Sequence, residues 1–129
     1  MYTPQLLDHF QNPRNVGALP PPAVGVRVEN PVCGDILDLC ARIEGGTVAE
    51  VRFQVRGCTA SIACASATTT LLGGLAVEEM HQVDAARIEA EVGSLESTSK
   101  HAARLCADGV KTLAEALQRH AAADAAKGA

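Results

Sequence analysis

The chain has 129 residues, the size of a single domain with one core. Its formal net charge of -4 provides no basic stripe that could neutralise phosphates, which argues against nucleic acid as the main partner. The N-terminus has no cationic segment followed by an apolar run, and no stretch approaches the ~18 apolar residues of a membrane span. We therefore expect a cytoplasmic protein that does not enter a membrane.

The first predicted element is a short helix. Thr3 followed by Pro4 is typical of an N-cap and the first helical position, and Asn12 with Pro13 ends the pattern. The chain that follows, up to Ala23, contains three consecutive prolines and therefore predicts an extended connection.

Three stretches with alternating apolar residues come next, and they predict strands. Apolar residues alternate with others over residues 24–30 and 37–43. Val51, Phe53 and Val55 likewise alternate with polar neighbours. A pair of glycines between the second and third stretches predicts a tight hairpin turn. The pattern indicates a three-stranded antiparallel meander with one solvated face.

The second half of the chain predicts helices. Residues 59–72 are small and apolar on all sides, which is typical of a helix buried by its neighbours. Residues 77–81 and 84–92 predict two short amphipathic helices. Residues 100–120 predict a long final helix, whose apolar stripe should face the sheet. The alanine-rich residues 121–129 are expected to be a flexible tail.

Cysteines provide the candidate chemistry, and there are five of them: Cys33, Cys40, Cys58, Cys64 and Cys106. An odd number of thiols in a reducing compartment is not expected to pair as structural disulfides. Cys40, on the polar face of its strand, and Cys64, inside the buried helix, are interpreted as structural. The isolated histidines His9, His81 and His120 are interpreted as solvated.

Two of the thiols lie where a metal could reach them. Cys33 occupies a turn between two predicted strands, with Asp35 beside it, and Cys58 lies where a strand passes into a helix. Free N–H groups and the dipole at a helix N-terminus favour a thiolate. Two thiolates with a carboxylate predict a soft-metal site, although each cysteine taken alone is more often inert.

Three motifs connect these residues. The chain reads Tyr-Thr-Pro-Gln-Leu-Leu-Asp-His-Phe-Gln-Asn-Pro-Arg-Asn-Val-Gly from Tyr2, Asn-Pro-Val-Cys-Gly-Asp around Cys33, and Arg-Gly-Cys-Thr-Ala-Ser-Ile-Ala around Cys58. In this order the motifs strongly resemble the IscU/NifU-type iron-sulfur cluster assembly scaffold family (NifU N-terminal domain-like), from Tyr2 to about Leu117. The resemblance implies a small antiparallel sheet with helices packed on one face (SufE/NifU-like). Both routes thus predict one α+β domain over residues 1–120.

The resemblance also implies a cluster site made of three cysteines, an aspartate and a histidine beside the third cysteine. Carried over by position, its matching residues here are Cys33, Asp35, Cys58 and His101. The third cysteine is missing, because Ala102 follows His101 where the family has His-Cys.

Cys106 is the nearest cysteine to that gap. It lies four residues beyond Ala102, which is one helical turn or ~5.4 Å. Cys106 either packs in the apolar stripe or acts as a rearranged ligand, and both interpretations remain open. The predicted metal ligands are therefore Cys33, Asp35, Cys58, His101 and Cys106.

Two further features bear on the branch of the family. Relatives served by a dedicated Hsp70-type chaperone carry Leu-Pro-Pro-Val-Lys, whereas residues 95–100 here read Leu-Glu-Ser-Thr-Ser-Lys. Without the two prolines the segment loses its preset extended shape, so a chaperone-assisted release is not expected. No insertion separates Cys58 from His101, which argues against the zinc-dependent sulfur-transfer branch.

The function implied by the resemblance is a scaffold for assembling and transferring a transient 2Fe-2S cluster, with iron and sulfide bound through cysteines and the aspartate. Such a protein is a carrier rather than an enzyme, and it works with a cysteine desulfurase and with apo iron-sulfur proteins, as a monomer or a homo-oligomer. The alternative is a zinc-binding persulfide acceptor that partners a cysteine desulfurase. A hydrolase using a Cys/His pair is a third, weaker hypothesis.

Overall fold

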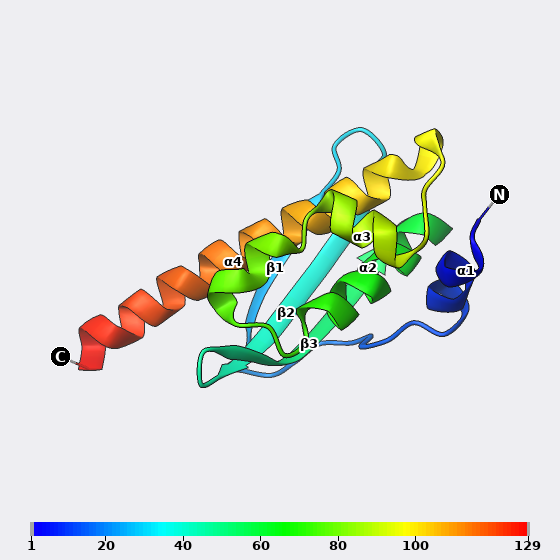
Figure 1. Ribbon diagram of the computed structural model, residues 1–129. Coiled ribbons are helices and arrows are strands. Elements are labelled where there is room, and N and C mark those ends of the chain that lie inside the picture. The colour runs from blue at the N-terminus through cyan, green and yellow to red at the C-terminus, as the bar shows by residue number, and fades with distance from the viewer. Residues whose placement is uncertain (1, 129) are drawn as a thin grey trace.

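A computed structural model describes residues 2–128, with side chains described for residues 2–121. Figure 1 shows the strands side by side, with helices before and after them in the chain. In chain order the elements are α1 (Pro4–Gln11), β1 (Val24–Glu29), β2 (Ile36–Glu44), β3 (Thr47–Arg56), α2 (Thr59–Leu72), the 3-10 helix η1 (Val77–Gln82), α3 (Ala85–Glu91), the 3-10 helix η2 (Ser97–Ser99) and α4 (Lys100–Gly128).

The strands form an antiparallel sheet in the order β1-β2-β3, which confirms the predicted meander. The central strand pairs on both sides, and its Leu39 lies opposite Val26 and Phe53. Gly45 and Gly46 connect β2 to β3 with φ values of 58° and 78°. A two-residue hairpin with positive φ at both positions matches the strand twist, and glycine adopts it without steric cost.

One face of the sheet is buried beneath helices. Leu37, Leu39 and Ala41 alternate along β2 and are almost fully buried, while the residues between them are half-exposed. α4 crosses this face so closely that a Cβ on Gly109 would lie 2.8 Å from Cδ2 of Leu37. α2 packs beside it, so both helices cover the same layer of apolar side chains, as predicted (Figure 1).

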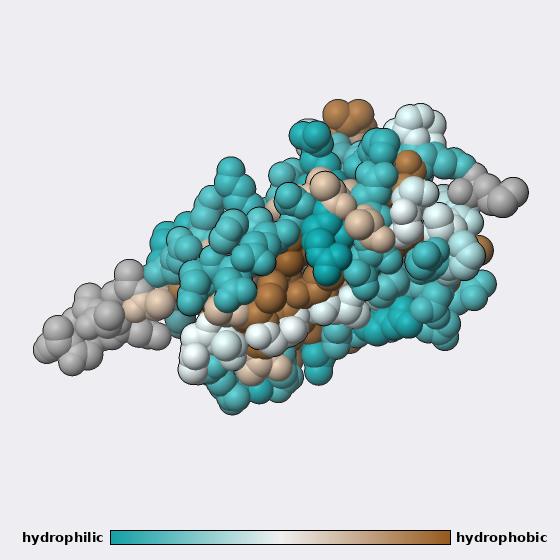
Figure 2. All heavy atoms as spheres, viewed as in Figure 1, coloured by the Kyte–Doolittle hydropathy of each residue, from teal (hydrophilic) through white to brown (hydrophobic). Residues whose placement is uncertain are grey.

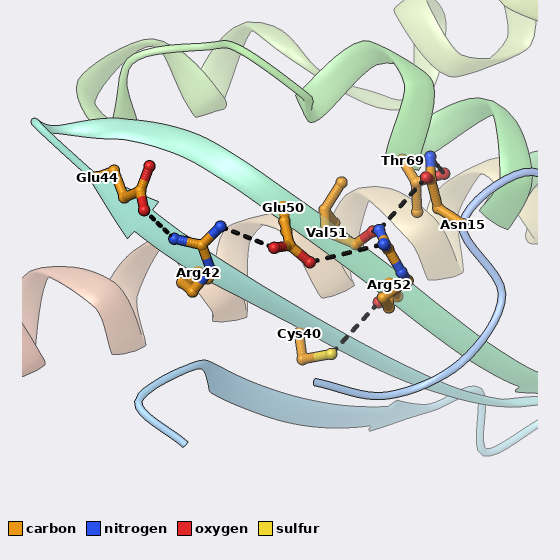
Figure 3. Close-up of polar contacts among 8 residues, drawn as sticks. All are labelled: Asn15, Cys40, Arg42, Glu44, Glu50, Val51, Arg52 and Thr69. Carbon is orange, nitrogen blue, oxygen red and sulfur yellow. Dashed lines mark hydrogen bonds and ion pairs between the residues drawn. The ribbon is translucent and has the colours of Figure 1, made fainter. Parts of the chain in front are cut away.

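The opposite face of the sheet carries a chain of polar contacts, drawn in Figure 3. Arg42 contacts Glu50 at 2.7 Å, and Arg52 lies 3.6 Å from the same carboxylate. Cys40 is half-buried on this face, with its Sγ 3.7 Å from the carbonyl oxygen of Arg52. The prediction that Cys40 lies on the polar face of its strand is thus confirmed. Exposed ion pairs of this kind add little stability.

The helix boundaries follow their capping residues closely. The Thr3 hydroxyl accepts a hydrogen bond from the N–H of Leu6, and Pro4 begins α1. Asp84 caps α3 in the same way. The short amphipathic helix predicted over residues 77–81 is present as a 3-10 helix, Val77–Gln82. The backbone of α4 continues beyond residue 120 to Gly128, so the flexibility of residues 121–129 stays a prediction, and Ala129 lies outside the described residues.

The interpretation of His9 as a solvated side chain is wrong. α1 packs against α2, and His9 lies between them with 8% of its surface exposed. Its Nδ1 is 2.8 Å from Oγ of Ser66 and 3.1 Å from a guanidinium nitrogen of Arg14. Burial and the neighbouring Arg14 charge lower the pKa of His9. The neutral form of this histidine is therefore part of the packing between α1 and α2.

This lowered pKa gives the stability of the protein a pH dependence. As the pH falls below the ordinary histidine pKa of 6.5, His9 becomes protonated in the unfolded chain but stays neutral in the folded chain. The free energy of unfolding should therefore decrease until the lowered pKa of the folded state is reached. Urea unfolding between about pH 7.5 and 5.5 measures this decrease.

A matched pair of variants separates His9 from the other histidines. His9→Gln should flatten the pH dependence over this range, whereas substitution of the exposed His81 by glutamine should leave it intact. An unchanged slope in His9→Gln would refute the assignment of this effect to His9.

The distribution of apolar residues bears on what the protein can contact. Figure 2 shows a mostly hydrophilic face, with apolar side chains visible in the middle of the molecule, between α2 and η1. Within the part of the chain that the structure describes, no helix is both long and apolar enough to cross a membrane.

Candidate metal centre

Three segments far apart in the sequence meet at one end of the molecule. They are the loop between β1 and β2, the start of α2 and the start of α4, all opposite the β2–β3 turn in Figure 1. Each of these segments carries at least one predicted ligand, and the contacts described below connect all three.

The loop between β1 and β2 presents Cys33 to solvent. Oδ1 of Asn30 accepts hydrogen bonds from the N–H groups of Val32 at 2.9 Å and Cys33 at 3.4 Å. Gly34 then turns the chain with φ 78°, a value that favours glycine. This local folding places the Cys33 thiol on an exposed tip and directs Asp35 back towards the sheet.

Three of the predicted ligands form a mutually close group. One ligand atom each from Cys33, Asp35 and His101 lies within 4.8 Å of the other two. His101 Nε2 is 3.9 Å from Asp35 Oδ2. Ligand atoms that share a tetrahedral metal lie roughly 3.5 Å apart, so small side-chain rotations would close this group around an ion. Thiolate, imidazole and carboxylate together suit iron or zinc.

Cys58 joins this group through His101. It is the N-cap residue of α2, with its thiol exposed, and its Sγ lies 3.7 Å from His101 Nε2. Cys58 is not a member of the mutually close trio. The structure therefore brings Cys33, Asp35, Cys58 and His101 to one end of the sheet, with Cys58 at the edge of the group.

Asp35 is the most enclosed of the four side chains. It is 8% exposed, and its Oδ2 accepts a hydrogen bond of 2.5 Å from Oγ of Ser61. On another side the carboxyl group packs on Gly57, where an added Cβ would lie 2.7 Å from both Cγ and Oδ2. The roles of Ser61 and Gly57 could not be predicted from the sequence. The available signal was a hydroxyl in the first turn of an otherwise apolar helix, three residues after Cys58.

Cys106 lies apart from this group, in the hydrophobic core. It is fully buried, and burial raises the pKa of its thiol to about 12, although a hydrogen bond with Thr68 opposes the shift. Burial also raises the pKa of the Cys64 thiol. Ala102, where the resemblance places a third cysteine, is likewise fully buried. The exposed thiols among the described residues are those of Cys33 and Cys58.

These environments predict a sharp difference in thiol reactivity. Iodoacetamide attacks thiolates, so the native protein should be alkylated quickly at Cys33 and Cys58. Cys64 and Cys106 should react only after denaturation, because they are buried and their thiols resist ionisation. Mass spectrometry of time points measures this order. Alkylation of Cys106 in the folded protein at the rate of Cys33 would contradict its placement in the core.

The sequence matches a known protein family and several of its named members. The family model described as the NifU-like N terminal domain matches residues 1–124. The Iron-sulfur cluster assembly scaffold protein IscU 1 of Archaeoglobus fulgidus is 36% identical over 112 residues, covering 86% of this chain and 72% of that protein. The mitochondrial Iron sulfur cluster assembly protein 1 of Schizosaccharomyces pombe is 37% identical, covering 87% of this chain and 60% of that protein.

A solved structure shows the same fold. The N-terminal part of a nitrogen-fixing NifU-like protein from Brucella abortus superimposes with a TM-score of 0.69 at 18% identity, covering 90% of this chain and 91% of that chain. The family match spans nearly the whole sequence, and the helices and sheet agree with those of a NifU-like structure. This chain therefore belongs to the NifU-like N terminal domain family.

Proposed function

We propose that this chain is a scaffold on which an iron-sulfur cluster is assembled and from which it is transferred to apo-proteins. The observation that carries the proposal is the meeting of two exposed thiols, a carboxylate and an imidazole at one end of the sheet. Membership in a family whose relatives are named cluster assembly scaffolds supports it.

The proposed roles follow from ligand chemistry. Cys33 and Cys58 are soft ligands that hold iron, and His101 is a further nitrogen ligand. Asp35 is a hard oxygen ligand beside soft thiolates, so it forms the weakest bond and is the natural point of release. The cluster is cargo that the protein holds and gives up, so no turnover chemistry is assigned to these residues.

The proposed partners follow from what a cluster requires. A cysteine desulfurase in the cytoplasm delivers sulfur as a persulfide to Cys58 or Cys33, and two electrons from a reductant, such as reduced ferredoxin, convert the outer persulfide sulfur to sulfide and restore the thiolate. Iron binds at the same site, and the cluster leaves for an apo iron-sulfur protein. With two accessible cysteines, one aspartate and one histidine, the ligand set is sufficient for a 2Fe-2S cluster, in which each iron takes two ligands from the protein.

Anaerobic reconstitution tests this proposal. Protein incubated with ferrous iron and sulfide should gain visible absorbance and hold iron and sulfide in equal amounts. Cys33→Ser and Cys58→Ser should each lose most of this absorbance, whereas the half-buried Cys40→Ser serves as a control that keeps it. A colourless protein with one tightly bound zinc would refute the proposal and favour the zinc-binding persulfide acceptor.

A further inference from the structure

Ser61 is a buried polar residue that touches two of the proposed ligands. Its side chain is 0% exposed, in the first turn of α2. Its Oγ lies 2.5 Å from Oδ2 of Asp35 and 3.3 Å from Sγ of Cys58. These contacts join the loop after β1 to the start of α2.

The single hydroxyl proton of Ser61 determines which contact lasts. Ser61 donates this proton to Asp35 Oδ2, so the contact with Cys58 must use the proton of the thiol. A cysteine that binds metal gives up that proton. The contact between Ser61 and Asp35 is therefore the one that persists when the site is loaded.

Gly57 completes the enclosure of the carboxyl group. An added Cβ at this position would lie 2.7 Å from Oδ2 of Asp35, so the carboxylate rests directly on the glycine backbone. With Ser61 bound to Oδ2 and Gly57 against the carboxyl group, the carboxylate has little freedom to turn. Oδ2 is also the oxygen 3.9 Å from His101 Nε2, and a carboxylate oxygen that accepts one hydrogen bond keeps a lone pair for a metal.

We propose that Ser61 is a positioning residue that holds Oδ2 of Asp35 and thereby fixes the orientation in which the carboxylate faces the metal. The inference rests on the proposed function, because the orientation of Asp35 matters only if this end of the chain binds metal. Hydrogen bonds that orient metal ligands typically change metal affinity by about 10–100-fold. Ser61 thus helps to set how firmly the weakest ligand is held.

Titration of the full chain with Co²⁺ tests this role, because Co²⁺ reports both affinity and thiolate ligation through its absorbance. Ser61→Ala should bind Co²⁺ about 10–100-fold more weakly than the natural chain, with an unchanged thiolate charge-transfer intensity per bound ion. Ser66→Ala is the matched control, since Ser66 is another fully buried serine of α2 whose hydroxyl contacts His9. Its affinity should change by less than about twofold.

A double-mutant cycle distinguishes positioning from a general structural role. If Ser61 acts through Asp35, then Ser61→Ala should change Co²⁺ affinity by less than about twofold when Asp35 is already alanine. The proposal would be overturned if Ser61→Ala weakened Co²⁺ binding as much in the Asp35→Ala variant as in the natural chain. A loss of thiolate charge-transfer intensity in Ser61→Ala would overturn it too. Equal affinity of Ser61→Ala and the natural chain would overturn it as well.

Gly57→Ala provides a second route that does not depend on Ser61→Ala remaining folded. The added methyl displaces the same carboxyl group from the other side, so it should weaken Co²⁺ binding and should also show no further effect in the Asp35→Ala background. If Gly57→Ala leaves Co²⁺ affinity unchanged, then the contacts of Ser61 and Gly57 do not position the Asp35 carboxylate, and the proposal is wrong. Failure of the natural chain itself to bind Co²⁺ would instead refute the metal site of the proposed function, and this inference with it.

Discussion

Replacing Ala102 with cysteine is expected to increase several-fold the amount of cluster that the reconstituted protein holds, and to lengthen its lifetime. Residue 102 directly follows His101 in the first turn of α4, where the helix dipole and a bound metal both favour a thiolate and so oppose the effect of its burial. His101 already reaches within 3.7 Å of Cys58 and 3.9 Å of Asp35. A third soft ligand beside it would hold iron more firmly than the oxygen and nitrogen ligands do. Absorbance decay after anaerobic reconstitution measures both quantities.

Two further variants control for the added thiol. Ala103→Cys places a cysteine at an equally buried neighbouring position on a different side of α4, and it should give no gain. Cys106→Ala should lower stability, because it leaves a small cavity in the core, but should cost little cluster. If Cys106→Ala abolishes reconstitution while Ala102→Cys changes nothing, then Cys106 is the third ligand and α4 shifts by a turn when the cluster binds.

Asp35→Ala is expected to make a bound cluster longer-lived rather than abolish it. Asp35 is the hard oxygen ligand among soft ones, so its bond is the one that opens first when another ligand attacks. Without it, the two thiolates and His101 remain, and the opening step has no weak bond to begin from. The rate of absorbance loss in the presence of an iron chelator measures the lifetime.

The control for this prediction is a more exposed carboxylate on the sheet, outside the group of predicted ligands. Asp38 pairs with Arg27 on the polar face, and Asp38→Ala should leave the cluster lifetime unchanged. Equal or faster cluster loss in Asp35→Ala would show that this carboxylate secures the cluster instead of releasing it.

Much of the fold could be predicted because local pattern and tertiary environment agree. The strands alternate on a sheet with one buried face, so β2 and β3 follow the sequence pattern closely. His9 could not be predicted as buried. Nothing in α1 alone indicates that α2 presents Ser66 opposite it, 57 residues later in the chain.

In the candidate site, too, contacts between residues close in the sequence could be predicted, whereas contacts that depend on helix packing could not. Cys33 and Asp35 are neighbours in one loop, so their proximity could be predicted from the sequence, and their motif resembles a known family. The approach of Cys58 to His101 spans 43 residues and depends on how α2 and α4 pack. Ser61 and Gly57 were missed because a buried serine and a strand-end glycine have many structural uses, and only the position of the Asp35 carboxyl group reveals theirs.

Transfer of a cluster to an apo-protein tests the central claim most directly. The reconstituted chain, freed of unbound iron and sulfide, would be mixed anaerobically with an apo-ferredoxin in the presence of an iron chelator. Our account predicts that the ferredoxin gains its cluster while this chain loses its own, faster than free iron and sulfide can supply it. Loss of iron to the chelator with no cluster in the ferredoxin would contradict the account.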